Sequence, residues 1–176
     1  PDQEDISTAL LGIDSLQQVY SARGQRRYEQ ALAALDQASG YFDQAAVQAS
    51  ALPDLKSQLQ REQSRWQRLD EERRVNSWTE AAINELRRAP FDDAAWQSAE
   101  ELGRRIVDNR AEDPRGLAVI GALQSLREAR QQLQASRFNQ AIELAEQARA
   151  SLAAIGLRQP LSVATETIEN QQDAYL

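Results

Sequence analysis

The sequence contains no histidine and no cysteine, so two residue types that carry much of enzyme chemistry are missing. Histidine is the usual general base near neutral pH, and both residues are the usual ligands of zinc. A serine or threonine nucleophile would need a base from Lys56 or from a carboxylate, and no Ser-x-x-Lys motif ends at Lys56. We therefore expect no enzymatic activity, no metal and no cofactor.

Long apolar runs are also missing. No stretch approaches the roughly 18 consecutive apolar residues of a transmembrane helix, and no signal peptide opens the sequence. We expect a soluble segment without direct membrane insertion, from either the cytoplasm or the periplasm, because a cysteine-free chain fits both. Since the sequence starts at Pro1 without an initiator methionine, we expect a processed form or a domain excised from a longer protein. Lys56 is the only lysine among 20 basic residues, a bias that favours a bacterial gene.

Positive charge is neither in excess nor clustered. The formal net charge is −7, whereas binding to a nucleic-acid backbone depends on clustered lysine and arginine. We expect no nucleic-acid partner. Four arginine pairs are spread along the chain and mostly have carboxylates nearby, which is typical of solvated helix faces; they are Arg26-Arg27, Arg73-Arg74, Arg87-Arg88 and Arg104-Arg105.

Glycine and proline are scarce, with 7 and 5 residues in a chain of 176, and this leaves room for long helices. Alanine, glutamine, glutamate, leucine and arginine dominate, and all are good helix formers. β-Branched residues are too few for sheets. The sequence therefore predicts an all-α fold in a single domain over residues 1–176, built as a stack of helical hairpins.

The first hairpin is expected over residues 5–52. One helix should end at Gly24, and the next should run from Arg26 past Gly40 to Leu52, because its apolar residues continue in steps of three and four. The first helix is expected to pack through one apolar face, formed by Ile6, Leu10, Ile13, Leu16 or Gln17, and Tyr20.

Residues 53–89 are expected to form a long connecting helix. Pro53 fits its first turn, but polar residues interrupt its apolar stripe, which predicts a half-exposed helix. The spacing of Ser77 and Glu80 matches a capping box, so a break at Ser77 is an open alternative. The stripe consists of Leu55, Leu59, Trp66 and Leu69, and its interruptions are Glu62, Arg73 and Asn76.

Further hairpins are expected over residues 92–156. Asp92 can cap a helix that carries Trp96 on its core face, and Asp113 followed by Pro114 is the clearest helix start in the chain. Ser136 marks the next turn. A final helix over 161–172, which is polar on its outer face, is expected to cap the stack.

Two of these helices begin with the same pattern, an aromatic residue followed after three positions by an alanine and after seven more by another alanine. The pattern resembles the second helix of a tetratricopeptide repeat, in which the two small residues lie where adjacent helices touch, and the match covers about a third of the chain. The resemblance implies a protein-binding scaffold that holds an extended peptide or a helix in a concave groove. The matching residues are Tyr28, Ala31 and Ala38, and Phe138, Ala141 and Ala148.

The candidate partner-binding residues lie on the irregular connecting helix. Trp66 is flanked by Arg65 and Arg68, and Trp78 lies further along the same expected helix. A partly exposed tryptophan beside arginine is a favoured anchor for a protein partner, and packing on a neighbouring helix is the alternative. We predict a non-enzymatic scaffold or adaptor that binds a protein or peptide. The alternative is a structural spacer or regulatory extracytoplasmic domain of a larger, membrane-anchored bacterial protein.

Overall fold

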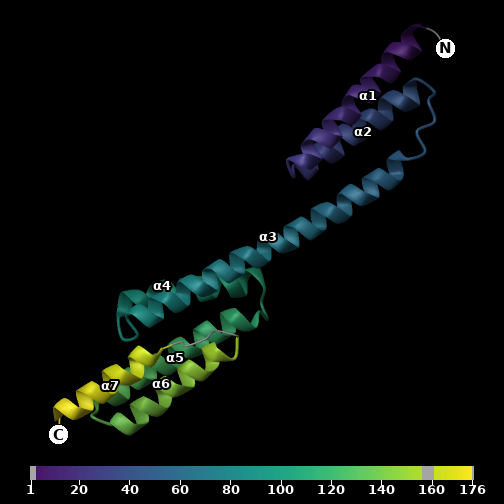
Figure 1. Cartoon of the computed structure of the whole chain (residues 1–176). Coiled ribbons are helices and arrows are strands. Elements are labelled where there is room, and N and C mark those ends of the chain that lie inside the picture. Colours follow the sequence, from purple (N-terminus) through teal and green to yellow (C-terminus); the bar gives the residue numbers. More distant parts are fainter. Residues whose placement is uncertain (1–2, 156–160, 176) are drawn as a thin grey trace. The chain divides into compact units, whose positions relative to one another are not determined.

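A computed structural model describes residues 3–155 and 161–175 (Figure 1). Within these ranges the chain is all-helical and contains no strand, so the predicted all-α class is confirmed. The helices are α1 (Gln3–Gly24), α2 (Tyr28–Gln44), α3 (Leu52–Arg88), α4 (Asp93–Asn109), α5 (Pro114–Gln134), α6 (Phe138–Ala153) and α7 (Ser162–Tyr175).

The chain forms two compact units, Pro1–Glu71 and Glu72–Leu176. Helix α3 contributes its first half to the first unit and its last turns to the second. Each unit has a hydrophobic cluster of its own. The single domain expected from the sequence stays a prediction, because two clusters do not tell whether each unit folds alone.

The first unit is built on an antiparallel hairpin of α1 and α2 (Figure 1). The helices approach closely at Gly12, where a Cβ atom would lie 2.8 Å from Cε1 of Phe42. The first part of α3 completes the core through Leu59, which is fully buried. The buried members of this cluster are Val19, Tyr28, Ala31, Ala34, Leu35 and Leu59.

The predicted packing face of α1 was wrong. Helix α1 buries the opposite side, which carries Gly12, Ser15 and Val19. Small residues on that side let α1 approach α2 closely. The contact is therefore stabilised by close packing of the two helices rather than by burial of large apolar side chains. Four residues of the predicted face are instead about half exposed, namely Ile6, Leu10, Ile13 and Tyr20.

Helix α2 ends at Gln44, so the predicted continuation to Leu52 was also wrong. Ala46 adopts a left-handed conformation with φ of 52°. The backbone N–H of Val47 then donates to the carbonyl of Phe42 at 2.8 Å, and that of Ala46 donates to Asp43 at 3.2 Å. These two bonds form a Schellman motif, which satisfies the last carbonyls and turns the chain away.

Helix α3 is continuous through Ser77, so the alternative of a break there is not realised. Two of the polar residues that interrupt its stripe bind arginines of other helices. Glu62 accepts two hydrogen bonds from Arg23 of α1, and Asn76 accepts one from Arg115 of α5 at 2.6 Å. Its buried residues in the second unit recur at helical spacing and are Val75, Thr79, Ala82, Ile83 and Leu86.

The second unit packs α4 to α7 and the end of α3 around one cluster. The predicted helix starts are confirmed: Asp92 accepts from the N–H of Ala95 at 2.9 Å, and Asp113 accepts from that of Arg115 at 3.0 Å. Helices α4, α5 and α6 form successive hairpins, and α7 packs against α6, where the capping helix was expected. Residue 156, at the predicted hairpin end, lies outside the described residues.

The two helices that share the aromatic and alanine pattern, α2 and α6, also follow the same turn. Arg26 and Ser136 are both left-handed, with φ of 60° and 56°. The next residue in each turn, Arg27 or Arg137, donates its N–H to a carbonyl of the preceding helix at 2.9 Å. The four alanines of the pattern are fully buried, so they are packing positions; they are Ala31, Ala38, Ala141 and Ala148.

Candidate protein-binding surface

Three of the four predicted partner-binding residues lie together on α3 in the first unit: Arg65, Trp66 and Arg68. The fourth, Trp78, belongs to the second unit and is half-buried. Arg65 and Arg68 line the surface described below, whereas Trp66 and Trp78 do not.

Trp66 is a packing residue as well as a surface residue. It is half-buried and packs against the cluster of the first unit. The guanidinium of Arg26 lies over its ring, 3.7 Å from the ring centroid, at a cation–π distance. One face of the indole is thus already covered by the turn between α1 and α2. The predicted alternative, packing on a neighbouring element, describes its present surroundings.

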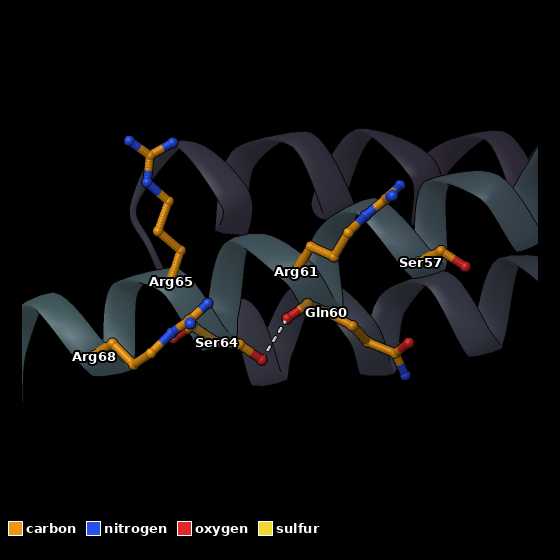
Figure 2. A pocket seen from close by; sticks show the side chains of 6 residues that line it. All are labelled: Ser57, Gln60, Arg61, Ser64, Arg65 and Arg68. Atoms are coloured by element: carbon orange, nitrogen blue, oxygen red, sulfur yellow. Dashed lines mark hydrogen bonds between the residues drawn. The ribbon is translucent and has the colours of Figure 1, made fainter.

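An open hollow of about 580 Å³ lies along α3, and Trp66 is not among the residues that line it (Figure 2). Arg61 and Arg65 reach out from the helix, and Arg68 lies along it, beside Ser64. Serine and glutamine at helical spacing form the floor, because their side chains are shorter than those of the arginines. We call this surface the arginine hollow; its residues are Ser57, Gln60, Arg61, Ser64, Arg65 and Arg68.

The hydrogen bonds within the arginine hollow stay inside α3. Ser64 Oγ donates to the carbonyl of Gln60 at 3.0 Å, and Arg68 Nε donates to the carbonyl of Ser64 at 3.2 Å. In the part of the chain that the structure describes, Arg61, Arg65 and Arg68 form no ion pair. Their guanidinium groups are exposed and keep most of their donors for another molecule.

Arg61 was missed from the sequence, although a signal for it exists. Arg61, Arg65 and Arg68 follow one another in steps of four and three, which places them along one side of a helix. The prediction was based on Trp66 and therefore named only the arginines nearest to it in the sequence, Arg65 and Arg68. The nearest acid along the helix, Glu62, is held by Arg23, and this pairing lowers the pKa of Glu62, mainly through the hydrogen bond from Arg23.

A second hollow, of about 530 Å³, lies between α4 and α5, and its charges are already paired. Arg127 binds Glu100, and Arg130 binds Asp93 at 2.6 Å. Trp96 beneath them is buried and donates its Nε1–H to the carbonyl of Pro90 at 2.7 Å, which confirms the prediction that it is a core residue. This hollow therefore offers a partner far fewer unpaired groups than the arginine hollow.

No group of three or more histidine, cysteine, aspartate or glutamate side chains within residues 3–155 and 161–175 has the geometry to hold a metal ion. None of the helices described combines the length and the apolar character needed to cross a bilayer.

No protein-family model, curated protein or solved structure matches this chain. The resemblance to tetratricopeptide repeats thus stays a prediction. The case for a function depends on the geometry of the chain itself.

Proposed function

We propose that this chain is a non-enzymatic protein-interaction module that binds an acidic segment of a protein partner at the arginine hollow. The observation that carries the proposal is three exposed guanidinium groups on one side of α3 that have no acidic partner among the described residues. Elsewhere in the first unit the basic groups Arg23 and Lys56 are paired with carboxylates across helices. Arg61, Arg65 and Arg68 differ from these two, because none of the three has an acidic partner among the residues that the structure describes.

Carboxylates suit this row in chemistry and spacing. A guanidinium presents a planar fork of donors that matches the two oxygens of a carboxylate. Arg61 and Arg68 are seven residues apart, or about 10 Å along a helix. An extended segment advances roughly 3.3 Å per residue, so acids at alternate positions of a short segment can meet successive arginines.

A protein segment is favoured over nucleic acid as the source of negative charge. The hollow holds three basic groups, whereas the chain as a whole carries a net charge of −7 and would repel a long polyanion. A short acidic segment meets the local positive charge without approaching the rest of the molecule.

The helical-repeat type of the scaffold is part of the proposal. Its support is the pair of identical turns at Arg26 and Ser136, each followed by a helix whose alanines are fully buried against neighbours. Tetratricopeptide-like hairpins are built on the same use of small residues. In such a scaffold the alanine faces hold the helices together, and the outer faces remain for partners.

The test is binding of a fluorescein-labelled peptide of alternating glutamate and serine, measured by anisotropy at low salt. We expect the triple variant Arg61→Ala, Arg65→Ala, Arg68→Ala to weaken binding about tenfold, because three exposed ion pairs at about 0.5 kcal/mol each together contribute about 1.5 kcal/mol. A peptide with glutamine in place of glutamate is the ligand control. The double variant Arg104→Ala, Arg105→Ala in the second unit is the protein control.

Two results would contradict the proposal. One is equal binding of the glutamate and glutamine peptides. The other is equal affinity in the triple variant and the control variant. A structural spacer would tolerate all of these substitutions and bind neither peptide.

A further inference from the structure

Helix α1 carries a second apolar face that residues 3–155 and 161–175 leave exposed. Ile6, Leu10, Ile13 and Tyr20 are 51%, 56%, 47% and 59% exposed. Scattered apolar side chains on a surface are ordinary, but these four share one side of a single helix, away from the side that packs on α2. We call this face the α1 seam.

The spacing of the α1 seam is that of a coiled coil. With Gln17 included, its positions advance by four, three, four and three residues, which is a heptad repeat of core positions. The seam from Ile6 to Tyr20 is about 21 Å long. A period of 3.5 residues favours a second helix as the occupant, because only a helix running alongside meets every position.

The charges along α1 favour a second copy of α1 in the opposite direction. Acidic residues lie in its first two-thirds, and basic residues lie at its end and in the following turn. Two parallel copies would place like charges together, whereas two antiparallel copies place the acidic end of each beside the basic end of the other. The residues that carry this asymmetry are Glu4 and Asp14 on the acidic side and Arg26 and Arg27 on the basic side, because the charge of Arg23 is already paired with Glu62.

From these observations we propose that two copies of this chain associate through an antiparallel pair of α1 helices along the α1 seam. The inference is independent of the proposed function, because the arginine hollow lies on α3 and its residues take no part in the seam. Ile6, Leu10, Ile13 and Tyr20 would become the apolar core of the pair. Gln17 is the polar residue at a core position, a device that selects register in coiled coils.

The first test is sedimentation equilibrium of the intact chain between about 1 and 500 μM, a range that brackets a weak dimer. We expect Leu10→Glu to raise the dimer dissociation constant at least about 100-fold, because it places a charge in the apolar seam. Leu11→Glu is the matched control. Leu11 is the next residue, is similarly exposed at 48%, and lies off the seam, so this variant should dimerise like the wild type.

The second test determines the direction of the helices. Because the chain has no cysteine, a spin label at Gln3→Cys is unique. In the antiparallel pair the two labels are separated by about 20–35 Å along the helices, whereas a parallel pair places them within roughly 15 Å. Pulsed electron paramagnetic resonance on the dimer measures this separation.

Several outcomes would overturn the proposal. They are a monomer over the whole concentration range, equal effects of Leu10→Glu and Leu11→Glu, and a short label separation. Binding of the monomer to phosphatidylcholine vesicles through Leu10 would assign the seam to a lipid surface and would also overturn it. The arginine triple variant should still dimerise, and Leu10→Glu should still bind the glutamate peptide, so failure of this proposal is distinguishable from failure of the proposed function.

Discussion

At the scale of single residues, Asp113 combines two roles that are usually separate. Its carboxylate caps α5 through the N–H of Arg115 and also binds the guanidinium of Arg115, which reaches on to Glu72 of α3. The Asp113 side chain is only 3% exposed. The hydrogen bond from the Arg115 side chain, first among several contacts, lowers the pKa of Asp113 below its ordinary value. One residue thus fixes both the start of α5 and its attachment to α3.

We expect Asp113→Asn to separate these roles. Asparagine is as good an N-cap as aspartate, but it leaves Arg115 without its buried carboxylate. The free energy of unfolding should fall by about 1–3 kcal/mol at pH 7. Because the folded pKa of Asp113 lies below the unfolded value of about 3.9, the carboxylate stabilises the wild type above that pH and loses this effect as pH falls through the folded pKa.

Urea denaturation of both proteins between pH 7 and pH 2.5 measures this difference in stability. The gap between wild type and Asp113→Asn should narrow as the pH falls below about 4. Equal stability of the two proteins over the whole range would mean that the ion pair contributes nothing, because asparagine keeps the cap. Lys56→Ala is a suitable control, because its pairing with Asp36 is exposed and should have little effect.

At the scale of helices, the two glycines of α5 have opposite surroundings. A Cβ at Gly116 would lie 2.8 Å from Cγ2 of Val107 and 3.1 Å from the backbone oxygen of Gly103, whereas a Cβ at Gly121 would meet nothing within 4 Å. We expect Gly116→Ala to lower the free energy of unfolding by about 1–2 kcal/mol, because a backbone oxygen cannot move aside.

The matched variant Gly121→Ala should raise the free energy of unfolding by about 0.5–1 kcal/mol through helix propensity alone. Both values come from chemical denaturation followed by circular dichroism. The same substitution at two positions of one helix should therefore change the free energy of unfolding in opposite directions. If both variants were stabilised, the close crossing of α4 and α5 at Gly116 would be wrong.

Helix starts could be predicted from the sequence, but some helix ends could not. Asp92 and Asp113 predict the starts of their helices, because aspartate is a preferred N-cap residue and can be recognised in the sequence. The turn after α2 is formed by Ala46, which is left-handed without being glycine, so no residue type marked the end. The cost of that conformation is offset by backbone hydrogen bonds and packing that depend on the folded chain.

The face that a helix buries was equally hard to read where small residues make the contact. The large apolar residues of α1 predicted one face, but Gly12, Ser15 and Val19 pack on α2. In α2 and α6 the alanines recur with an aromatic residue, and there the packing face was predicted correctly. For the candidate site, the sequence pointed to Arg65, Trp66 and Arg68, but pairing across helices decides which arginines are free, and only the fold determines it.

At the scale of the whole molecule, the shared pattern of α2 and α6 places an equivalent buried alanine in each of the two units. Ala31 lies in the cluster of the first unit and Ala141 in that of the second, and both are fully buried. Since each is a fully buried member of its cluster, a larger side chain must displace its neighbours. We expect Ala31→Leu and Ala141→Leu each to lower the free energy of unfolding by about 1–3 kcal/mol through overpacking.

Amide hydrogen exchange then determines how far each effect extends. Because the two clusters have no buried member in common, we expect Ala31→Leu to accelerate exchange in residues 3–71 and Ala141→Leu to accelerate it in the second unit. Acceleration along the entire chain by either variant would instead mean that the two units unfold as one cooperative domain. If both substitutions left stability unchanged, these alanines would not be close-packed contacts, and the interpretation of the chain as an array of helical hairpins would be wrong.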